Sequence, residues 1–437
     1  MSSRGGLALA DLEQQPVDLV GLGIDICALI PRISKLAGPV RAYLDNPDDL
    51  SADETRICSK HKVVVKAVSS WTDPAPIAVR APGFPRYRED IAPVLDRVKV
   101  TTPIDLWLNT LGPDHPTVLV TGTKGKSTVT TMIKALLGRS EMAGNIGMPI
   151  WSLLNIKKGR PVICEVSSYQ AADIDAVVDL AVLTSLSEDH VSWHGSVERY
   201  HADKLGPVNQ ARRVLTHPEF IGALSTRAGE VRTVEPLHTD GLTMPSHMAA
   251  NAELAIAAAL WVKEIYPGVQ ISADPVAVLN KLPALPGRLR PVISEYDEHH
   301  WFDDSLASNP SGAAAAVRAF LGKPIYLIVG GIDRNVSLDP LIAAVKEAMA
   351  AHSAFSIATL PDNGMMIAEQ LVHACGDFVQ IIEAKTVAEA VESARIFSDQ
   401  STVVLFSPAA PTPARFGNWA DRSAEFVTAV KGGAPFN

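Results

Sequence analysis

The chain has 437 residues, of which 47% are hydrophobic and 20% are charged, so it can form several globular domains with sizeable cores. Its formal net charge of −9 argues against a nucleic-acid-binding protein, whose surface is usually basic. No apolar run is long enough to span a bilayer and the N-terminus lacks a secretory signal, so we expect a cytoplasmic protein without a membrane partner.

The N-terminal part of the chain alternates short strand patterns with helix patterns. Strands are predicted at Val17–Val20, Val40–Leu44, 63–68 and Ile77–Arg80. A helix pattern with apolar residues at 28–36 ends at Gly38-Pro39. Strands that alternate with helices form a parallel sheet, so we expect a Rossmann-like unit here. Proline-containing breaks near residues 103 and 113 are predicted to separate this unit from the next.

A glycine-containing turn, Gly21-Leu22-Gly23, follows the first of these strands. The third glycine of a G-x-G-x-x-G motif would fall at Ile26, so the dinucleotide fingerprint fails. A nucleotide-sized ligand is compatible with this turn, with Asp45 at the end of the second strand in hydrogen-bonding position. A turn without a ligand is the alternative, and the sequence leaves both interpretations open.

The most informative stretch runs from apolar residues 118–120 through the glycine-rich residues 122–128 into a helix pattern. Small residues let backbone N–H groups face an anion, and the helix adds the positive end of its dipole. Lys126 would reach the outer phosphates of a nucleoside triphosphate, and the Ser127 hydroxyl would hold Mg²⁺. A tight turn with an incidental lysine is the alternative, which the strand–loop–helix context disfavours.

Two further strands are predicted beside this loop, at 162–166 and 180–184. The first carries Glu165, whose buried charge needs a cation, so we favour a magnesium ligand over a structural role. The second leads to His190, for which a ligand role is favoured over a cap of the strand end. Lys204, on a short predicted helix at 197–205, has no distinguishing feature by itself and would be taken for an ordinary surface lysine.

The rest of the chain contains a long helix, an irregular hinge and a third α/β unit. The helix covers 249–265 and contains Asn251, and the hinge covers 281–288. We predict three domains, at 1–104, 105–286 and 287–437. The third has predicted strands at 291–294, 301–303, 325–329, 354–358, 378–382 and 402–406, and predicted helices at 311–320, 338–351, 364–374, 387–397 and 419–430.

The four cysteines are scattered and form no CxxC pair, which is typical of a reducing compartment. The sequence therefore suggests neither a disulfide framework nor a zinc site. The cysteines are Cys27, Cys58, Cys164 and Cys375.

A set of short motifs is distributed along the whole chain: GTKGKST at 122–128, GNIGMP at 144–149, EVSSYQ at 165–170, SEDH at 187–190, YHADK at 200–204, NA at 251–252, LPGR at 285–288, DDSLASNP at 303–310, VGGIDR at 329–334 and SPAAP at 407–411. With these motifs, three α/β units with a phosphate loop heading the middle one resemble the Mur ligases, the ATP-dependent amide-forming enzymes of peptidoglycan precursor synthesis. GNIG, EVSSYQ and SPA look most like the MurD branch, which adds glutamate to UDP-N-acetylmuramoyl-L-alanine.

The resemblance implies a role for each matching position. Catalysis would rest on Lys126, His190 and Lys204, and Lys204 would be carbamylated by CO₂, which turns a cation into a metal-binding anion. Two magnesium ions would be held by Ser127, Glu165, His190 and Lys204. ATP would contact Gly122, Thr123, Lys124, Gly125, Lys126, Ser127, Thr128, Asn251, Arg288 and Asp304. The UDP-linked substrate would contact Gly21, Leu22, Gly23, Ile24, Asp45, Asn145 and Ser167.

The implied reaction has two steps. The alanine carboxylate of the UDP-linked substrate attacks the γ-phosphate of ATP and forms an acyl phosphate, and ADP leaves. The amine of glutamate then attacks the acyl phosphate, an amide forms and phosphate leaves. The family likeness also suggests a monomer.

The departures from the MurD pattern cluster around the incoming amino acid. Leu306 stands where the family has lysine, Arg334 replaces another lysine and Thr412 replaces a serine. Arg334 and Thr412 would still form a clamp for a carboxylate, because arginine offers a planar fork of donors. Ser308 and Trp419, also altered, complete the amino-acid-binding set.

Outside this region, Lys124 stands in the phosphate loop where the family has asparagine. Changes confined mainly to the amino-acid pocket favour L-glutamate as the added amino acid, because some MurD-like ligases add that isomer. The competing interpretation is neutral drift in an ordinary D-glutamate ligase. Less favoured are a related Mur-type or folylpolyglutamate-type ligase and an inactive nucleotide-binding homologue.

Overall fold

The computed structural model describes residues 6–225, 228–234, 241–244, 246–283, 285–334, 336–351, 354–376 and 379–432. The chain divides into two compact units, Met1–Met244 with Met248–Leu282, and Pro283–Asn437 with Pro245–His247. The first unit carries two sheets and the second carries one. Ala284 of the predicted hinge and Phe378 at a predicted strand start lie outside the described residues. The domain borders at 104 and 286 stay predictions.

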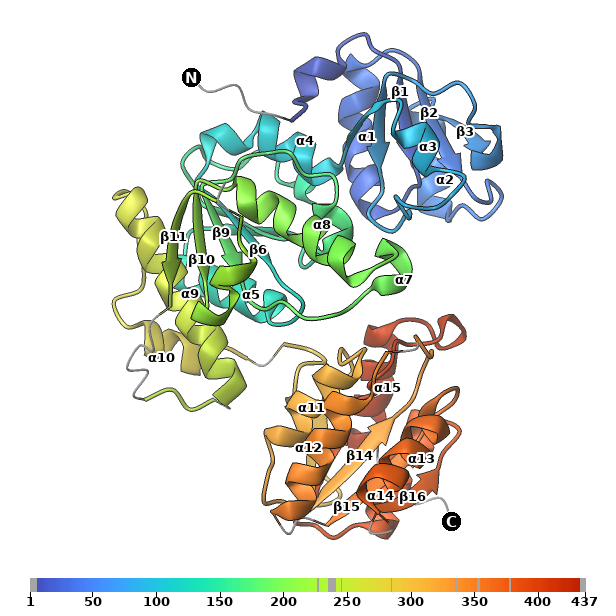
Figure 1. Cartoon of the computed structure of the whole chain (residues 1–437), viewed down its shortest axis with the longest axis vertical. Coiled ribbons are helices and arrows are strands. Elements are labelled where there is room, and N and C mark those ends of the chain that lie inside the picture. Colours follow the sequence, from blue (N-terminus) through green and yellow to red (C-terminus); the bar gives the residue numbers. More distant parts are fainter. Residues whose placement is uncertain are drawn as a thin grey trace. The chain divides into compact units, whose positions relative to one another are not determined.

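The first sheet is parallel, with strand order β3-β2-β1-β4-β5. Three predicted strands agree with it residue for residue, because each is a compact apolar run between turn residues. The β5 strand and the α2 helix were not predicted. The strands are β1 Val17–Val20, β2 Val40–Leu44, β3 Val64–Ala67, β4 Ile77–Arg80 and β5 Lys99–Thr101, and the helices are α1 Ile24–Leu36, α2 Ala52–Lys60 and α3 Ala92–Leu95 (Figure 1).

The second sheet is also parallel, with order β11-β10-β9-β6-β8-β7. Its strands are β6 Thr117–Thr121, β7 Glu141–Gly144, β8 Val162–Glu165, β9 Leu180–Leu183, β10 Arg213–Thr216 and β11 Glu230–Thr233. Its helices are α4 Pro103–Thr110, α5 Lys126–Leu137, α6 Ser168–Ala171, α7 Val191–His194, α8 Val197–Gln210, α9 Ser246–Ile265 and α10 Pro275–Asn280.

Two proline-containing segments differ from the sequence-based prediction. Pro103 begins α4 instead of marking a break, because Thr102 accepts the N–H of Asp105 and caps the helix. The prediction ends α8 at Leu205, but the helix continues through Pro207 to Gln210.

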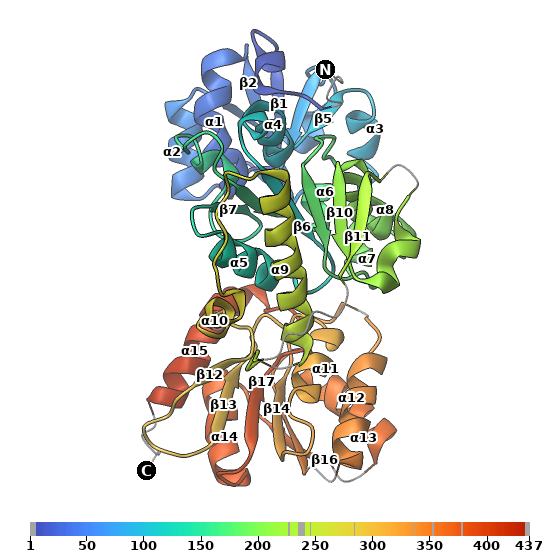
Figure 2. The same ribbon diagram turned by 90° about the vertical axis from the view of Figure 1, so that its left-hand side faces the viewer.

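The alanine-rich helix α9 packs along the second sheet (Figure 2). Its residues Leu254, Ala258 and Val262 are fully or almost fully buried against β6 and α5. An amphipathic stripe is absent from this part of the helix because the helix is enclosed on most sides. Within the described residues, no helix has the length and apolar character needed to cross a membrane.

The third sheet forms the core of the second unit, with order β12-β13-β17-β14-β15-β16. Only the edge strand β12 is antiparallel to its neighbour. The strands are β12 Arg290–Val292, β13 His300–Asp303, β14 Ile325–Val329, β15 Phe355–Thr359, β16 Val379–Glu383 and β17 Val403–Phe406, and the helices are α11 Pro310–Arg318, α12 Asp339–Ala350, α13 Gly364–Cys375, α14 Val387–Phe397 and α15 Trp419–Lys431. The α/β class with three α/β units, predicted from the sequence, is confirmed by the three sheets.

A buried arginine joins the first sheet to the second within the first unit. Arg80, at the end of β4, has no solvent exposure, and its Nε donates to Asp173 Oδ2 at 2.6 Å. Its other nitrogens donate to the carbonyl oxygens of Phe84 at 3.0 Å and Tyr169 at 2.6 Å. One side chain therefore satisfies groups from several segments that are distant in sequence.

We expect Arg80→Ala to lower the free energy of unfolding by about 3–5 kcal/mol, because it leaves buried carbonyl groups without donors and removes a cation from beside Asp173. Urea denaturation followed by circular dichroism measures this change. Arg56→Ala is the matched control, since Arg56 also pairs with an aspartate but is largely exposed and should change stability by less than about 1 kcal/mol. Equal effects for the two variants would contradict the structural role of Arg80.

Candidate active site

The phosphate loop joins β6 to α5 at the carboxyl end of the second sheet. Gly122 and Gly125 have φ values of 149° and 81°, in the region that favours glycine. A Cβ atom on Gly122 would lie 2.1 Å from Thr184 Oγ1, and one on Gly125 would lie 2.5 Å from Asn251 Oδ1. Both glycines are thus required sterically, and Asn251, expected near ATP, lies against the loop.

Two lysines donate to the same carbonyl oxygen in this loop. Lys126 Nζ and Lys204 Nζ each lie 2.9 Å from the oxygen of Gly122. Ser127 and Thr128 occupy the first turn of α5, where backbone N–H groups have no partner inside the helix. The loop therefore combines a cationic side chain with a helix N-terminus, an arrangement that suits the phosphates of a nucleotide.

Lys204 is buried, with only 1% of its surface exposed. Its Nζ also lies 4.9 Å from the centre of the Tyr200 ring. Burial shifts the pKa of Lys204 well below its ordinary value, and the charge of Lys126 lowers this pKa further. Burial therefore favours the neutral amine of Lys204 over its charged form, and the prediction of an ordinary surface lysine from the isolated residue is wrong.

Glu165 ends β8 and is completely buried. Its Oε1 accepts a hydrogen bond from Asn145 Nδ2 at 2.7 Å, whereas its buried Oε2 has no hydrogen-bond partner among the described residues. An unpartnered buried carboxylate oxygen at the carboxyl end of a strand fits a hard divalent cation. Asn145, expected at the UDP-linked substrate, therefore also contacts a candidate metal ligand.

His190 follows the loop after β9 and adopts a left-handed backbone conformation with a φ of 52°. Its Nδ1 lies 2.8 Å from the hydroxyl oxygen of Tyr169. The preceding residue, Asp189, lies 3.4 Å from Lys124 Nζ of the phosphate loop. In the part of the chain that the structure describes, no cluster of three or more His, Cys, Asp or Glu side chains is arranged to hold a metal. The predicted metal set of Ser127, Glu165, His190 and a modified Lys204 stays a prediction.

The residues expected to hold the UDP-linked substrate lie at the carboxyl end of the first sheet and beside β8. Gly23 caps α1, and the adjacent side chain of Ile24 is exposed. Asp45, at the end of β2, pairs with Arg88 at 2.6 Å. Ser167 accepts the N–H of Gln170 and caps the short helix α6. The turn at Gly21 and Leu22 lies between β1 and α1, next to the switch in strand order of this sheet.

The second unit carries the other residues expected at ATP. Asp304 follows β13 and accepts hydrogen bonds from Ser407 Oγ at 2.7 Å and the N–H of Leu289 at 3.2 Å. Burial raises the pKa of Asp304 to about 7, although Ser407 and the charge of Arg288 act in the opposite direction. Ser308 is half-buried in the loop before α11.

The predicted amino-acid clamp lies on loops that follow adjacent parallel strands of the second unit. Arg334 comes after β14 and is exposed, and Thr412 comes after β17 and is half-buried. The N–H of Ile332 donates to Pro411 O at 2.9 Å, which brings these loops together. Trp419 begins α15, and a Cβ atom on Gly287 would lie 3.1 Å from its ring.

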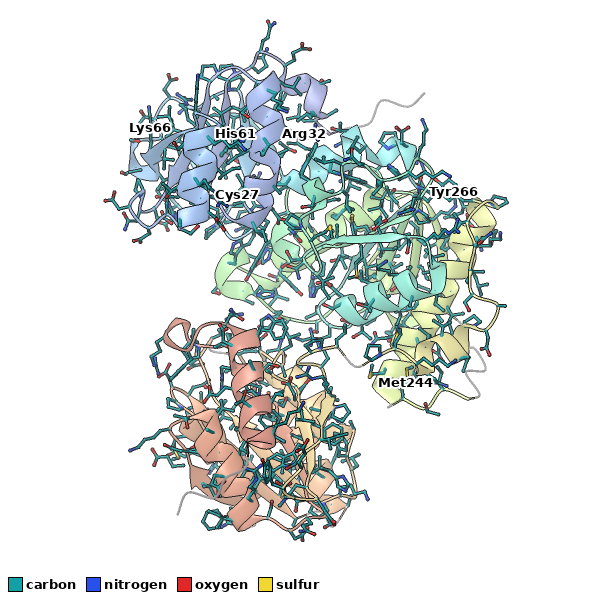
Figure 3. The ribbon with its side chains drawn as sticks, turned by 180° about the vertical axis from the view of Figure 1, so that it is seen from behind. Cys27, Arg32, His61, Lys66, Met244 and Tyr266 are labelled. Carbon is teal, nitrogen blue, oxygen red and sulfur yellow. The ribbon has the colours of Figure 1, made fainter. Side chains whose placement is uncertain are left out.

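A cavity of about 470 Å³ opens at the opposite end of the second sheet. It is lined by His115, Asp179, Arg212 and Tyr266, the last at the end of α9 (Figure 3). None of the predicted site residues lines this cavity, so the loops at the carboxyl ends of the strands remain the candidate site.

A family model described as the Mur ligase middle domain matches residues 120–213. The UDP-N-acetylmuramoyl-L-alanine–L-glutamate ligase of a Micromonospora species is 31% identical over 82% of this chain and 82% of its own length. The UDP-N-acetylmuramoylalanine–D-glutamate ligase of Rubrobacter xylanophilus is 27% identical over 77% of this chain and 80% of its own length. The MurF ligase of Thermotoga maritima in complex with ADP shares the fold, with a TM-score of 0.54 and 14% identity over 97% of this chain and 96% of its own.

Proposed function

Since the chain belongs to the Mur ligase family and is an ATP-dependent, amide-forming enzyme of the MurD type, we propose that it joins glutamate to UDP-N-acetylmuramoyl-L-alanine. The alanine carboxylate attacks the γ-phosphate of ATP, giving an acyl phosphate and ADP. The glutamate amine then forms the amide bond and releases phosphate. ATP is consumed because an unactivated carboxylate has no adequate leaving group.

The observation that carries this proposal is the cluster of charged side chains near the phosphate loop, in which Lys204 and Glu165 are buried and Lys126 is half-buried. Lys126 and Lys204 meet at one carbonyl oxygen, and Glu165 presents an unpartnered buried oxygen. Lys126 offsets charge on the transferring phosphoryl group. Ser127, Glu165, His190 and carbamylated Lys204 would hold magnesium, which supplies positive charge to the phosphate oxygens.

An inactive nucleotide-binding homologue is the interpretation that the cluster argues against. A protein that only bound a nucleotide would have no use for a buried carboxylate with one unpartnered oxygen and for a buried lysine, because each lowers stability. A ligase for a different acceptor is a second competing interpretation, since Mur ligases share this chemistry and differ in the substrates they join.

We favour L-glutamate over D-glutamate as the added amino acid. The sequence departures near the amino-acid pocket all fall in the second unit, at Leu306, Arg334, Thr412 and Trp419. The residues expected at the phosphates and the metal match the family motifs, at Lys126, Glu165, His190 and Lys204. The Micromonospora relative, named for L-glutamate, is also more similar than the Rubrobacter relative, named for D-glutamate.

The test is to incubate the protein with ATP, Mg²⁺ and UDP-N-acetylmuramoyl-L-alanine, and to offer L- and D-glutamate separately. We expect phosphate release and the ligated product with L-glutamate. Faster release with D-glutamate would overturn the stereochemical preference but leave the ligase function in place. No turnover with either isomer, in the presence of bicarbonate, would overturn the proposed substrate pair.

Arg334→Ala should raise the KM for glutamate by about 10- to 100-fold and leave the KM for ATP unchanged, because a charge-assisted hydrogen bond to a carboxylate contributes roughly 1.5–3 kcal/mol. Steady-state phosphate release at varied glutamate and varied ATP measures both constants. Arg415→Ala is the matched control, since Arg415 is an exposed arginine of the same unit that pairs with Asp362. An unchanged KM for glutamate in Arg334→Ala would show that Arg334 does not bind the glutamate carboxylate.

A further inference from the structure

Tyr169 contacts the candidate metal ligand His190 directly, although sequence reasoning assigned it no role. Its hydroxyl oxygen lies 2.8 Å from His190 Nδ1, and the two rings lie 4.8 Å apart at 60°. The other imidazole nitrogen, Nε2, is not part of this contact. The hydroxyl group therefore contacts one ring nitrogen of His190 specifically.

The Tyr169 side chain is held in place by its neighbours. Its ring stacks on Trp193, with centroids 4.7 Å apart and planes inclined by 28°. Arg80 donates to the Tyr169 carbonyl oxygen and also lies over the Trp193 ring, 5.2 Å from its centre. A residue fixed in this way can determine the orientation of a neighbouring imidazole, because its hydroxyl cannot move far from Nδ1.

The contact allows two arrangements of hydrogen, with opposite consequences. If Nδ1–H donates to the Tyr169 hydroxyl oxygen, Nε2 keeps a lone pair and can bind a cation. If the hydroxyl donates to Nδ1, Nε2 carries the hydrogen and cannot bind a cation. Asp189 Oδ1 lies 3.8 Å from Nδ1, and its negative charge favours the first arrangement, with hydrogen on Nδ1.

We propose that Tyr169 is a positioning residue that accepts the Nδ1–H of His190, and so keeps the Nε2 lone pair available for a divalent cation. Histidines that bind metals usually donate their other ring N–H to a fixed acceptor, and the Tyr169 hydroxyl oxygen supplies that acceptor. This inference rests on the proposed function, in which His190 is a metal ligand.

The experiment uses the full-length protein labelled with ¹⁵N-histidine, and compares it with Tyr169→Phe, which removes only the hydroxyl group. In the metal-free protein, we expect the His190 resonances to report hydrogen on Nδ1, and a shift toward hydrogen on Nε2 in the variant. Binding of Mn²⁺ in the presence of ADP, followed by electron paramagnetic resonance, should weaken by about 10-fold. Tyr87→Phe is the matched control, since the Tyr87 ring also packs against Trp193 but its hydroxyl group donates to Asp203.

The outcomes separate this inference from the proposed function. If His190→Ala binds Mn²⁺ as tightly as the original protein does, His190 is not a metal ligand. The metal-binding role of His190 in the proposed function and the positioning role of Tyr169 are then both overturned. If His190→Ala weakens Mn²⁺ binding but Tyr169→Phe changes neither the tautomer nor the affinity, only the role of Tyr169 is overturned. A tautomer shift of equal size in Tyr87→Phe would also overturn the role of Tyr169. The effect would then come from the packing around Trp193 and not from the Tyr169 hydroxyl group.

Discussion

Replacing Lys126 with methionine should lower the rate of phosphate release by about 10³-fold and leave the thermal stability nearly unchanged. The rate falls because the γ-phosphoryl group loses a protein cation during transfer, when charge develops on the phosphate oxygens. Stability changes little because the side chain is only half-buried and its amine donates to backbone carbonyl oxygens, those of Gly122 and Thr123. Phosphate release in steady state and thermal unfolding by circular dichroism measure the two effects.

Lys134→Met is the matched control for this variant. Lys134 lies on the same helix, α5, and also donates to a backbone carbonyl oxygen, that of Ser140 at 3.0 Å, but it lies farther along the helix from the phosphate loop. Its replacement should leave turnover within about twofold of the original. A Lys126→Met enzyme with more than about a tenth of the original rate would show that phosphoryl transfer does not depend on this amine.

The fold was predictable where secondary structure follows from a local pattern. The strand β14 and the helix α14 agree with prediction residue for residue. An apolar run between turn residues predicts the strand and apolar residues at helical spacing predict the helix, and neither pattern needs distant information. The strands β7 and β10 were missed. Glu141 and Gly144 within β7 have weak strand propensity, and pairing with β8 determines this strand instead.

Some residues of the candidate site could likewise be identified from the sequence, and others could not. The phosphate loop could be identified because its residues are contiguous and their spacing has a physical reason. Tyr169 could not, because its contact with His190 joins α6 to the loop after β9, and no sequence periodicity connects them. The family resemblance included Tyr169 and Tyr200 within its motifs, so the missing information was the geometry and not the residues.

The burial of Lys204 bears on the proposed metal site. The Lys204 amine donates a hydrogen bond to the Gly122 carbonyl oxygen and has no anionic oxygen, so in its unmodified form it adds no negative charge to the magnesium site that Glu165 and His190 would form. We propose that reaction of Lys204 with CO₂ supplies this negative charge. The neutral amine attacks the carbon, the N–C bond forms, one amine proton passes to solvent, and the product carries a negative charge.

Lys204→Ala should therefore lower the rate of phosphate release by about 10²- to 10³-fold, because a metal-binding anion is lost. Short carboxylic acids such as acetate should restore part of the rate, since they can supply a carboxylate in the space left by the side chain. The original enzyme should lose activity in CO₂-free buffer and regain it with bicarbonate. A carbamate resonance should appear on exposure to ¹³CO₂ and be absent from the variant.

Two controls make the carbamate test decisive. Lys204→Arg keeps a cation that cannot be carbamylated, so its activity should be low, insensitive to bicarbonate and, because the space is filled, not restored by acetate. Thermal unfolding of each variant shows whether the fold is retained. Two results would exclude the carbamate: full activity of Lys204→Ala in the absence of added acids, or equal activity of the original enzyme with and without CO₂. The metal would then have to be held by Glu165, His190 and Ser127, without an anion from Lys204.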